Sequence, residues 1–359
     1  MCAWFLVVME FCGVCAVGGV AACGSGSNRS IDAMPDAGPP PCVYTEKADA
    51  TNDPAGDPAS DPKAEPTGLT IGTMPQILCG TINAGHFNSA TMTVDADAYR
   101  VASDGTNVVV RFSGSSGAPA MARFSVFVFD FDENMDPRLL FGGSNSPSVR
   151  DHGAFLIALP AGTYEVVVSA QGSADLAASF DYRVEIAPDG PTRCPAVTAP
   201  AAYTEAADGA GASNDVVAFD FDFDPSLQLT TSTTDVPEPT GLTIDASTPI
   251  RITGSSANGD AEDDYMDRDT YLIRTGATTN ELTLRLDWAD AHADLNYLVF
   301  PADQTEKVGD SLRFDSHEEY NVIAVNPDSS YWIWVGSHDD STGLPAAYDL
   351  TICGTSLIR

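Results

Sequence analysis

Basic residues are scarce in this sequence. Of its 359 residues only 17 are lysine or arginine, against 51 aspartate and glutamate, which gives a formal net charge of −34 at pH 7. A surface of this charge repels phosphate backbones, so the composition excludes nucleic acid as a partner. The same electrostatics disfavour adsorption to anionic lipid, so attachment to a membrane needs a route other than charge.

The motifs of common hydrolases are also missing. The five histidines form no His-Glu-x-x-His motif, which zinc peptidases use to place two imidazoles on one helical face. Residues 309–312 spell Gly-Asp-Ser-Leu, the motif of an esterase family, but they follow strand-like segments and no Asp-x-x-His comes after them. We therefore expect no enzyme and no catalytic residues. A hydrolase that uses Ser311 is the weakest alternative.

Residues 1–22 are predicted to be a signal peptide. Residues 4–22 are apolar or small apart from Glu10, and a Gly/Ser segment follows at once, which is typical of a signal core and not of a membrane span. The run ends in Val20-Ala21-Ala22-Cys23, and small residues before a cysteine resemble the bacterial lipobox. That resemblance implies cleavage before Cys23 and lipid on this cysteine. The alternative is an ordinary cleaved signal with an incidental cysteine.

A lipid on Cys23 would bring the membrane as a partner without any electrostatic attraction, because each buried methylene contributes about 0.8 kcal/mol. The expected location is therefore the bacterial cell envelope, at the outer membrane or the cell surface. Residues 23–41 are rich in glycine, serine, proline and aspartate, and we expect them to form a tether.

The rest of the chain repeats itself. The longest match is Glu65–Ile71, whose sequence EPTGLTI recurs as Glu238–Ile244. Shorter matches follow the same order: Tyr44-Thr45-Glu46 with Tyr203-Thr204-Glu205, Asp95-x-Asp97-x-Tyr99 with Asp267-x-Asp269-x-Tyr271, 163–168 with 330–335, and 182–186 with 348–352. We interpret the chain as a duplicated domain, with one copy in residues 42–190 and the other in 191–359.

Each copy shows the pattern of short strands. Leu282, Leu284 and Leu286 alternate with polar residues, a period of two that buries one face of a strand. Turn signals such as Asp104-Gly105 and Asn258-Gly259 separate the apolar segments, and no segment of twelve residues shows a helical period. The sequence predicts an all-β fold of two tandem antiparallel β-sandwich domains of jelly-roll-like type.

Four cysteines follow Cys23: Cys42, Cys79, Cys194 and Cys353. An even number in an exported protein predicts two disulfides, for which three connectivities exist. We favour Cys42–Cys79 and Cys194–Cys353, because each bond then stays within one copy. None of the four belongs to a Cys-x-x-Cys pair, which argues against zinc or thioredoxin-type chemistry.

The order of motifs resembles that of the bacterial pre-peptidase C-terminal domain, a small β-sandwich often appended to secreted proteases. The motifs are an Ile-x-x-Gly opening, Asp-x-Asp-x-aromatic, a strand such as 293–298, a Gly-Thr-Tyr-type strand and a final Tyr-x-Leu-x-Ile strand. They cover residues 250–352 in the second copy and 77–186 in the first. The resemblance implies an accessory or binding module, and some relatives bind calcium or matrix polymers.

Acidic residues provide candidate calcium ligands, because calcium prefers six to eight oxygens. One group has oxygen ligands at alternate positions, and a second group is an acidic pair present in both copies: Asp130, Asp132, Asn134 and Asp136 in the first group, and Asp95, Asp97, Asp267 and Asp269 in the second. The alternatives are a charged turn for the first group and a strand-entry turn bonded to backbone amides for the second. Calcium is the only cofactor that the sequence suggests.

Two tryptophans are candidate ligand-binding residues. Trp332 and Trp334 alternate with Tyr331, Ile333 and Val335, which we expect to face the core because their counterparts in the first copy do. The tryptophans would then lie on the outer face, where they could stack on a sugar ring or contact a partner, unless another part of the chain covers them.

The sequence thus predicts an exported cell-surface lipoprotein that acts as a non-enzymatic binding or adhesion module. Calcium would support the module, and its partner would be a polysaccharide, a protein or a matrix component. The alternative is a purely structural envelope lipoprotein without a ligand site.

Overall fold

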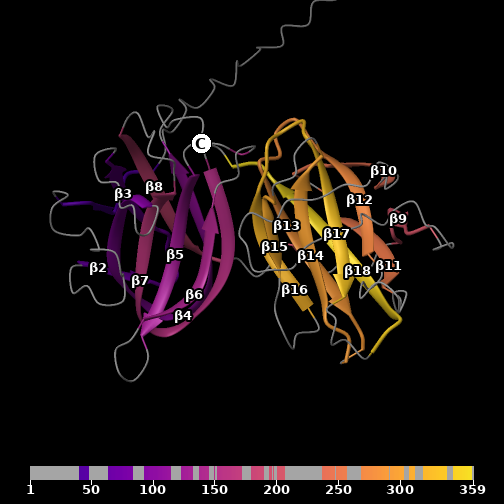
Figure 1. The fold of residues 1–359 in the computed structure, drawn as a ribbon, viewed down its shortest axis with the longest axis horizontal. Coiled ribbons are helices and arrows are strands. Elements are labelled where there is room, and N and C mark those ends of the chain that lie inside the picture. The colour runs from indigo at the N-terminus through magenta and orange to yellow at the C-terminus, as the bar shows by residue number, and fades with distance from the viewer. Residues whose placement is uncertain are drawn as a thin grey trace, which may run out of the picture. The chain divides into compact units, whose positions relative to one another are not determined.

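The computed structural model describes most of the chain after the tether. The described residues are 40–47, 64–83, 93–114, 123–131, 137–144, 149, 152–171, 179–189, 194–195, 197, 200–206, 237–246, 248–256, 268–290, 292–302, 307–311, 318–337 and 343–357. Every regular element in these ranges is a β-strand, as the sequence predicts (Figure 1). The described strands all lie within residues 41–359, which form one compact unit.

Strands β1 to β8 form one eight-stranded sheet with the order β1-β3-β8-β4-β7-β5-β6, in which β2 also pairs with β4. Their bounds are β1 Tyr44–Thr45, β2 Glu65–Ile71, β3 Gln76–Ile82, β4 Thr93–Gly114, β5 Arg123–Phe131, β6 Pro137–Ser144, β7 His152–Gln171 and β8 Phe180–Pro188.

Strands β9 to β18 form two five-stranded sheets, with the orders β10-β12-β17-β14-β15 and β16-β13-β18-β11-β9. Their bounds are β9 Tyr203–Thr204, β10 Glu238–Ile244, β11 Ile250–Ser256, β12 Arg268–Thr275, β13 Glu281–Trp288, β14 Leu295–Pro301, β15 Gly309–Ser311, β16 Glu318–Ala324, β17 Ser330–Ser337 and β18 Ala346–Thr355. One core cluster contains Tyr297 and Ile333 from the first of these sheets and Leu284 and Ile352 from the second, so the two sheets enclose a common core.

The strands of the first half (β1 to β8) and of the second half (β9 to β18) pair in the same register. Tyr99 is opposite Val166 in the first half, and its counterpart Tyr271 is opposite Ile333 in the second. The remaining equivalences agree: Glu65↔Tyr99 with Glu238↔Tyr271, Tyr44↔Leu78 with Tyr203↔Ile252, Leu78↔Val184 with Ile252↔Leu350, and Val110↔Ile186 with Leu284↔Ile352. The sequence repeat is therefore a repeat of hydrogen-bonded structure.

The halves differ in the continuity of two strands. β4 covers the positions of β12 and β13 together, and β7 covers those of β16 and β17. In β4 the core-facing residues have odd numbers up to Val101 and even numbers from Val108 onward. Gly105, with φ +97°, lies at the switch, where a residue with a side chain would be strained. The residues of β4 that face the core thus change from odd-numbered to even-numbered positions near Gly105. As a result, β4 contributes to the core both before and after this bend.

Both disulfides have the predicted pairing, Cys42–Cys79 and Cys194–Cys353. Disulfides are typical of proteins folded in an oxidising compartment, so they indicate an exported protein. Five residues singled out from the sequence lie outside the described ranges: Cys23, Asp132, Asn134, Asp136 and Asp267.

Candidate functional site

A buried network of hydroxyl groups surrounds Asp97 in the first half. Asp97 and Tyr99 are two residues apart on β4, so their side chains share the inward face. Tyr182 on β8 donates its hydroxyl to Asp97 Oδ2 at 2.7 Å and also forms a hydrogen bond with the hydroxyl of Tyr99. Asp97 and Tyr99 are fully buried, and Tyr182 is nearly so.

The second half contains the same network. Tyr348 on β18 donates to Asp269 Oδ2, and its hydroxyl oxygen is 2.5 Å from that of Tyr271. Gly254 on β11 lies directly beneath: a Cβ there would be 2.3 Å from Tyr348 Oη and 2.7 Å from Tyr271 Oη. Gly80 holds the same position against Tyr182. Only glycine leaves room for the paired hydroxyls at these two positions.

Burial and the neighbouring aspartate both raise the pKa values of the network tyrosines. Desolvation, followed by the negative charge of Asp97, raises the pKa of Tyr99 and of Tyr182 well above the usual 10. Burial and Asp269 raise the pKa of Tyr271 and Tyr348 in the same way. The hydroxyls therefore stay protonated: Tyr182 and Tyr348 donate to the buried aspartates, and Tyr99 and Tyr271 are hydrogen-bonded to the hydroxyls of these donors.

Two glutamates border this network in each half. In the first half, Glu65 accepts the Tyr44 hydroxyl at 2.8 Å, and Glu46 accepts the backbone N–H of Thr81 at 2.8 Å. Their counterparts in the second half also accept backbone N–H groups, Glu238 from Ala206 at 2.9 Å and Glu205 from Ser255 at 2.7 Å. The sequence patterns did not single out these glutamates or the partner tyrosines, although all of them lie in or next to the repeated segments.

The candidate calcium ligands that are described have protein partners. Asp95 Oδ2 accepts the backbone N–H of Asn83 at 2.6 Å, which agrees with the expected alternative of a turn bonded to an amide. Asp97 and Asp269 are bonded to tyrosines, which the sequence did not indicate. Asp130 forms an ion pair with Arg138. Within the described ranges, no three His, Cys, Asp or Glu side chains are grouped as a metal site would require.

The tryptophan strand β17 has the predicted facing. Tyr331, Ile333 and Val335 belong to the main core of the second half, whereas Trp332 and Trp334 lie on the opposite face with Leu298 and Phe300 of β14. Trp334 is only 3% exposed, and Trp332 is half-buried. Trp332 is therefore the indole of this pair that presents surface, and ligand contact stays a prediction.

Ser311 ends the three-residue strand β15, which pairs with β14. Asp310 beside it forms an ion pair with Lys307. The position is an outer strand of a five-stranded sheet, whereas the esterase motif belongs after the first strand of an α/β fold.

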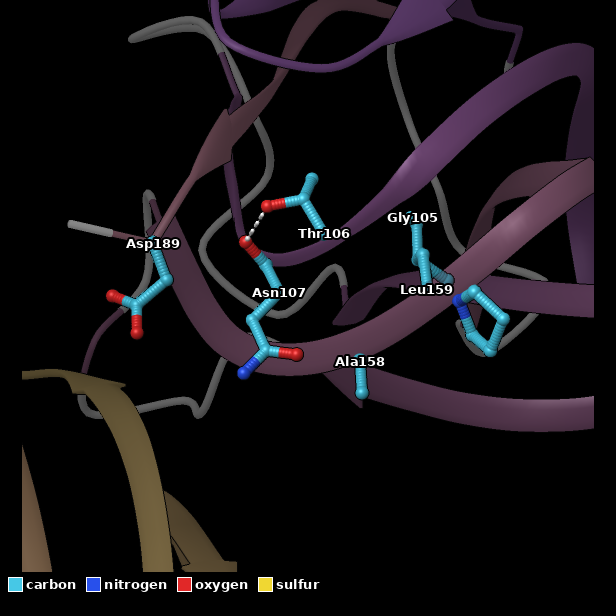
Figure 2. Close-up of a pocket in the computed structure, with 7 residues that line it drawn as sticks. Gly105, Thr106, Asn107, Ala158, Leu159 and Asp189 are labelled. Carbon is cyan, nitrogen blue, oxygen red and sulfur yellow. Dashed lines mark hydrogen bonds between the residues drawn. The ribbon is translucent and has the colours of Figure 1, made fainter. Parts of the chain in front are cut away.

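An open groove of about 580 Å³ lies where β4 and β7 bend (Figure 2). Its lining consists of Gly105, Thr106, Asn107, Ala158, Leu159, Pro160 and Asp189. Thr106 donates its hydroxyl to the backbone carbonyl of Asn107, and the side chains of Asn107 and Asp189 are the polar groups nearby. None of the candidate metal-ligating or ligand-binding residues predicted from the sequence lines this groove.

No family model and no curated protein sequence matches the chain. Among solved structures, it is similar to the pre-peptidase C-terminal domain of collagenase from Bacillus anthracis, with 14% identity over 33% of this chain and 96% of that chain and a TM-score of 0.24. It is also similar to the periplasmic lysozyme inhibitor PliG from Salmonella Typhimurium, with 15% identity over 32% of this chain and 98% of that chain and a TM-score of 0.20. The ANXUR2 extracellular domain from Arabidopsis thaliana has 10% identity over 77% of this chain and 88% of that chain, with a TM-score of 0.21. Likeness at this level assigns no function.

In the ranges that the structure describes, no helix is long and apolar enough to cross a membrane.

Proposed function

We propose that the protein is an exported cell-surface lipoprotein whose two tandem β-sandwich domains, residues 42–190 and 191–359, form a non-enzymatic binding module. The domains are of the pre-peptidase C-terminal type. Lipid on Cys23 attaches the module to the outer membrane, and residues 23–41 hold it away from the surface. The partner is an extracellular polysaccharide, a protein or a matrix component. The two disulfides and the duplicated strand pairing support this organisation.

The observation that carries the binding role is the aromatic cluster on the outer face of β14 and β17. It contains Leu298, Phe300, Trp332 and Trp334. The register gives Trp332 and Trp334 the positions that Glu165 and Val167 occupy in the first half, so the indoles belong to the second half alone. A half-buried indole set among apolar neighbours is the arrangement that stacks on sugar rings or anchors a partner.

A pull-down with insoluble polysaccharides and matrix proteins tests this role in the full chain. We expect Trp332→Ala to reduce retention by at least tenfold, because truncating an aromatic anchor costs about 2 kcal/mol or more and about 1.4 kcal/mol corresponds to tenfold. Phe127→Ala is the matched control, since Phe127 lies on the equivalent outer face of the first half. Equal retention of the two variants, or no retention of the wild type by any matrix, contradicts the proposal.

The burial of Trp334 favours a second candidate, a structural envelope lipoprotein that presents no ligand site. In that case neither substitution changes retention, and both affect only stability. A hydrolase using Ser311 is the weakest candidate.

A further inference from the structure

The two halves meet through the same strand of each copy. The first part of β7 packs against β16, and the register makes these two segments equivalent. Leu156 is opposite Val109 on β4, and Val322 is opposite the corresponding Thr283 on β13. In the same way Ala154 corresponds to Tyr320, because each is opposite an arginine, Arg111 or Arg285.

Equivalent residues touch one another at this contact. One apolar cluster contains Val109, Leu156 and Val322, with Ala154 and Tyr320 packed against it. Leu156 and Val322 are nearly or fully buried, although both lie on the faces turned away from the cores of their own halves. Contact between like positions is the property of an isologous interface, in which one patch is used by both partners.

The side chain of Asn321 on β16 links the two strands, and its counterpart in the first half is Phe155, which cannot accept a hydrogen bond. The N–H of Leu156 donates to Asn321 Oδ1 at 2.8 Å, and the N–H of the equivalent Val322 donates to the same oxygen at 2.8 Å. One side chain thus satisfies two equivalent donors from the two copies. β16 is the outer strand of its sheet, and the first part of β7 pairs with β4 alone because β5 pairs only with residues 165–171. Strand edges of this kind need cover because their N–H groups promote association.

A charge pair beside this cluster also departs from the equivalence. Arg111 donates to both oxygens of Glu281, with Nε–Oε2 at 2.7 Å and Nη2–Oε1 at 3.1 Å. The Glu281 side chain is 1% exposed and that of Arg111 is 13% exposed. Arg285, the counterpart of Arg111, instead pairs with Asp287 on its own strand. The position equivalent to Glu281 is Asn107, which carries no charge.

We propose that this face is a self-association surface that duplication has placed within one chain, and that the Arg111–Glu281 pair selects pairing between the two halves over pairing between chains. The occupant of the surface, once freed, is the same face of a second copy of this chain. Pairing two first halves would bring residue 111 opposite the neutral Asn107, and nothing there would replace the ion pair.

Calorimetry and light scattering of the full chain test the proposal. We expect the wild type to be a monomer that unfolds in one transition. Arg111→Glu places a third carboxylate beside Glu281 and Glu185 and should separate the halves, lowering the first midpoint by about 5–10 °C. The exposed self-association surface should then produce a concentration-dependent dimer, and a further Leu156→Asp substitution should abolish this dimer. The charge-swapped Arg111→Glu/Glu281→Arg should restore the monomer and the single transition.

Arg285→Glu is the matched control, because it reverses the equivalent charge, which pairs with Asp287 on its own strand and not with the other half. Arg111→Gln provides a milder variant with the same expected order of effects if Arg111→Glu does not fold. A control that behaves like the Arg111 variants would overturn the proposal. So would separated halves that stay monomeric at high concentration, or a charge swap that does not restore the wild-type behaviour.

Discussion

Because four of its tyrosines are buried beside aspartates, we expect the protein to lose stability in alkali. The pKa values of Tyr99, Tyr182, Tyr271 and Tyr348 are raised above 10 in the folded state by burial and by the adjacent aspartates. In the unfolded chain each tyrosine returns to about 10. Their contribution to stability is therefore complete below pH 10 and is lost as the pH rises from 10 toward the folded-state pKa.

The magnitude follows from linkage. Each tyrosine that is protonated only in the folded state costs about 1.4 kcal/mol of unfolding free energy per pH unit above 10. Four such groups give a slope of about 5–6 kcal/mol per pH unit, shared between the two halves. Single domains have about 5–15 kcal/mol in total, so unfolding is expected within about two pH units above 10.

Denaturant unfolding at pH 8, 9, 10 and 10.5 measures the unfolding free energy at each pH. Tyrosinate absorbance, recorded on the same samples, measures how many tyrosines are ionised. We expect at least four of the eleven tyrosines to ionise only when the protein unfolds. Tyr182→Phe should reduce the alkaline slope by about 1.4 kcal/mol per pH unit and cost about 1.5–3 kcal/mol at pH 8, because Asp97 loses a hydroxyl donor. Ionisation of all eleven tyrosines in protein that is still folded would refute the reasoning.

Two further predictions concern cross-links and cations. Replacing Cys194 and Cys353 by serine should cost about 5 kcal/mol of unfolding free energy, and replacing Cys42 and Cys79 about 4 kcal/mol. The first bond contributes more because it closes the longer loop, with a separation of 159 residues against 37. Denaturant titration gives both values, and the reverse order would contradict the chain-entropy explanation. If calcium binds the acidic segments, calcium at 100 times its dissociation constant should stabilise the fold by about 2.7 kcal/mol relative to chelator, and Asp130→Asn should reduce this gain. Identical melting curves in calcium and chelator would contradict the expectation that calcium supports the module.

The sequence predicted the all-β class and the internal repeat because two independent signals agreed. The recurrence of EPTGLTI and the alternation of Leu282, Leu284 and Leu286 both appear in the observed pairing. The continuity of β4 through Gly105 was not predictable, because Asp104-Gly105 is a turn signal in sequence. The dipeptide marks a bend within one strand here, since β7 pairs with β4 on both sides of it.

The network was predicted only in part. Asp97 and Asp269 stood out because the acidic pattern recurs, but their partners did not, since Tyr182 lies 85 residues from Asp97 and Tyr348 lies 79 from Asp269. A local pattern cannot indicate a hydrogen bond across that separation. Burial decided the chemistry: a carboxylate without solvent takes hydroxyl donors from the neighbouring strand, and glycine at 80 and 254 provides the space.

The two halves share the same buried hydrogen-bond network but carry different residues on the outer face of the strand that bears the tryptophans. This difference gives a way to tell which of the two features binds a ligand. The Asp–Tyr–Tyr network, the bordering glutamates and the close glycine occur twice, so any ligand bound through them should bind with two equivalent sites per chain. The indoles of β17 occur once, and Glu165 and Val167 take their places in the first half. A partner bound through Trp332 should therefore saturate at one per chain. The measured stoichiometry thus distinguishes a site in the duplicated interior from one on the aromatic face, before any residue is replaced.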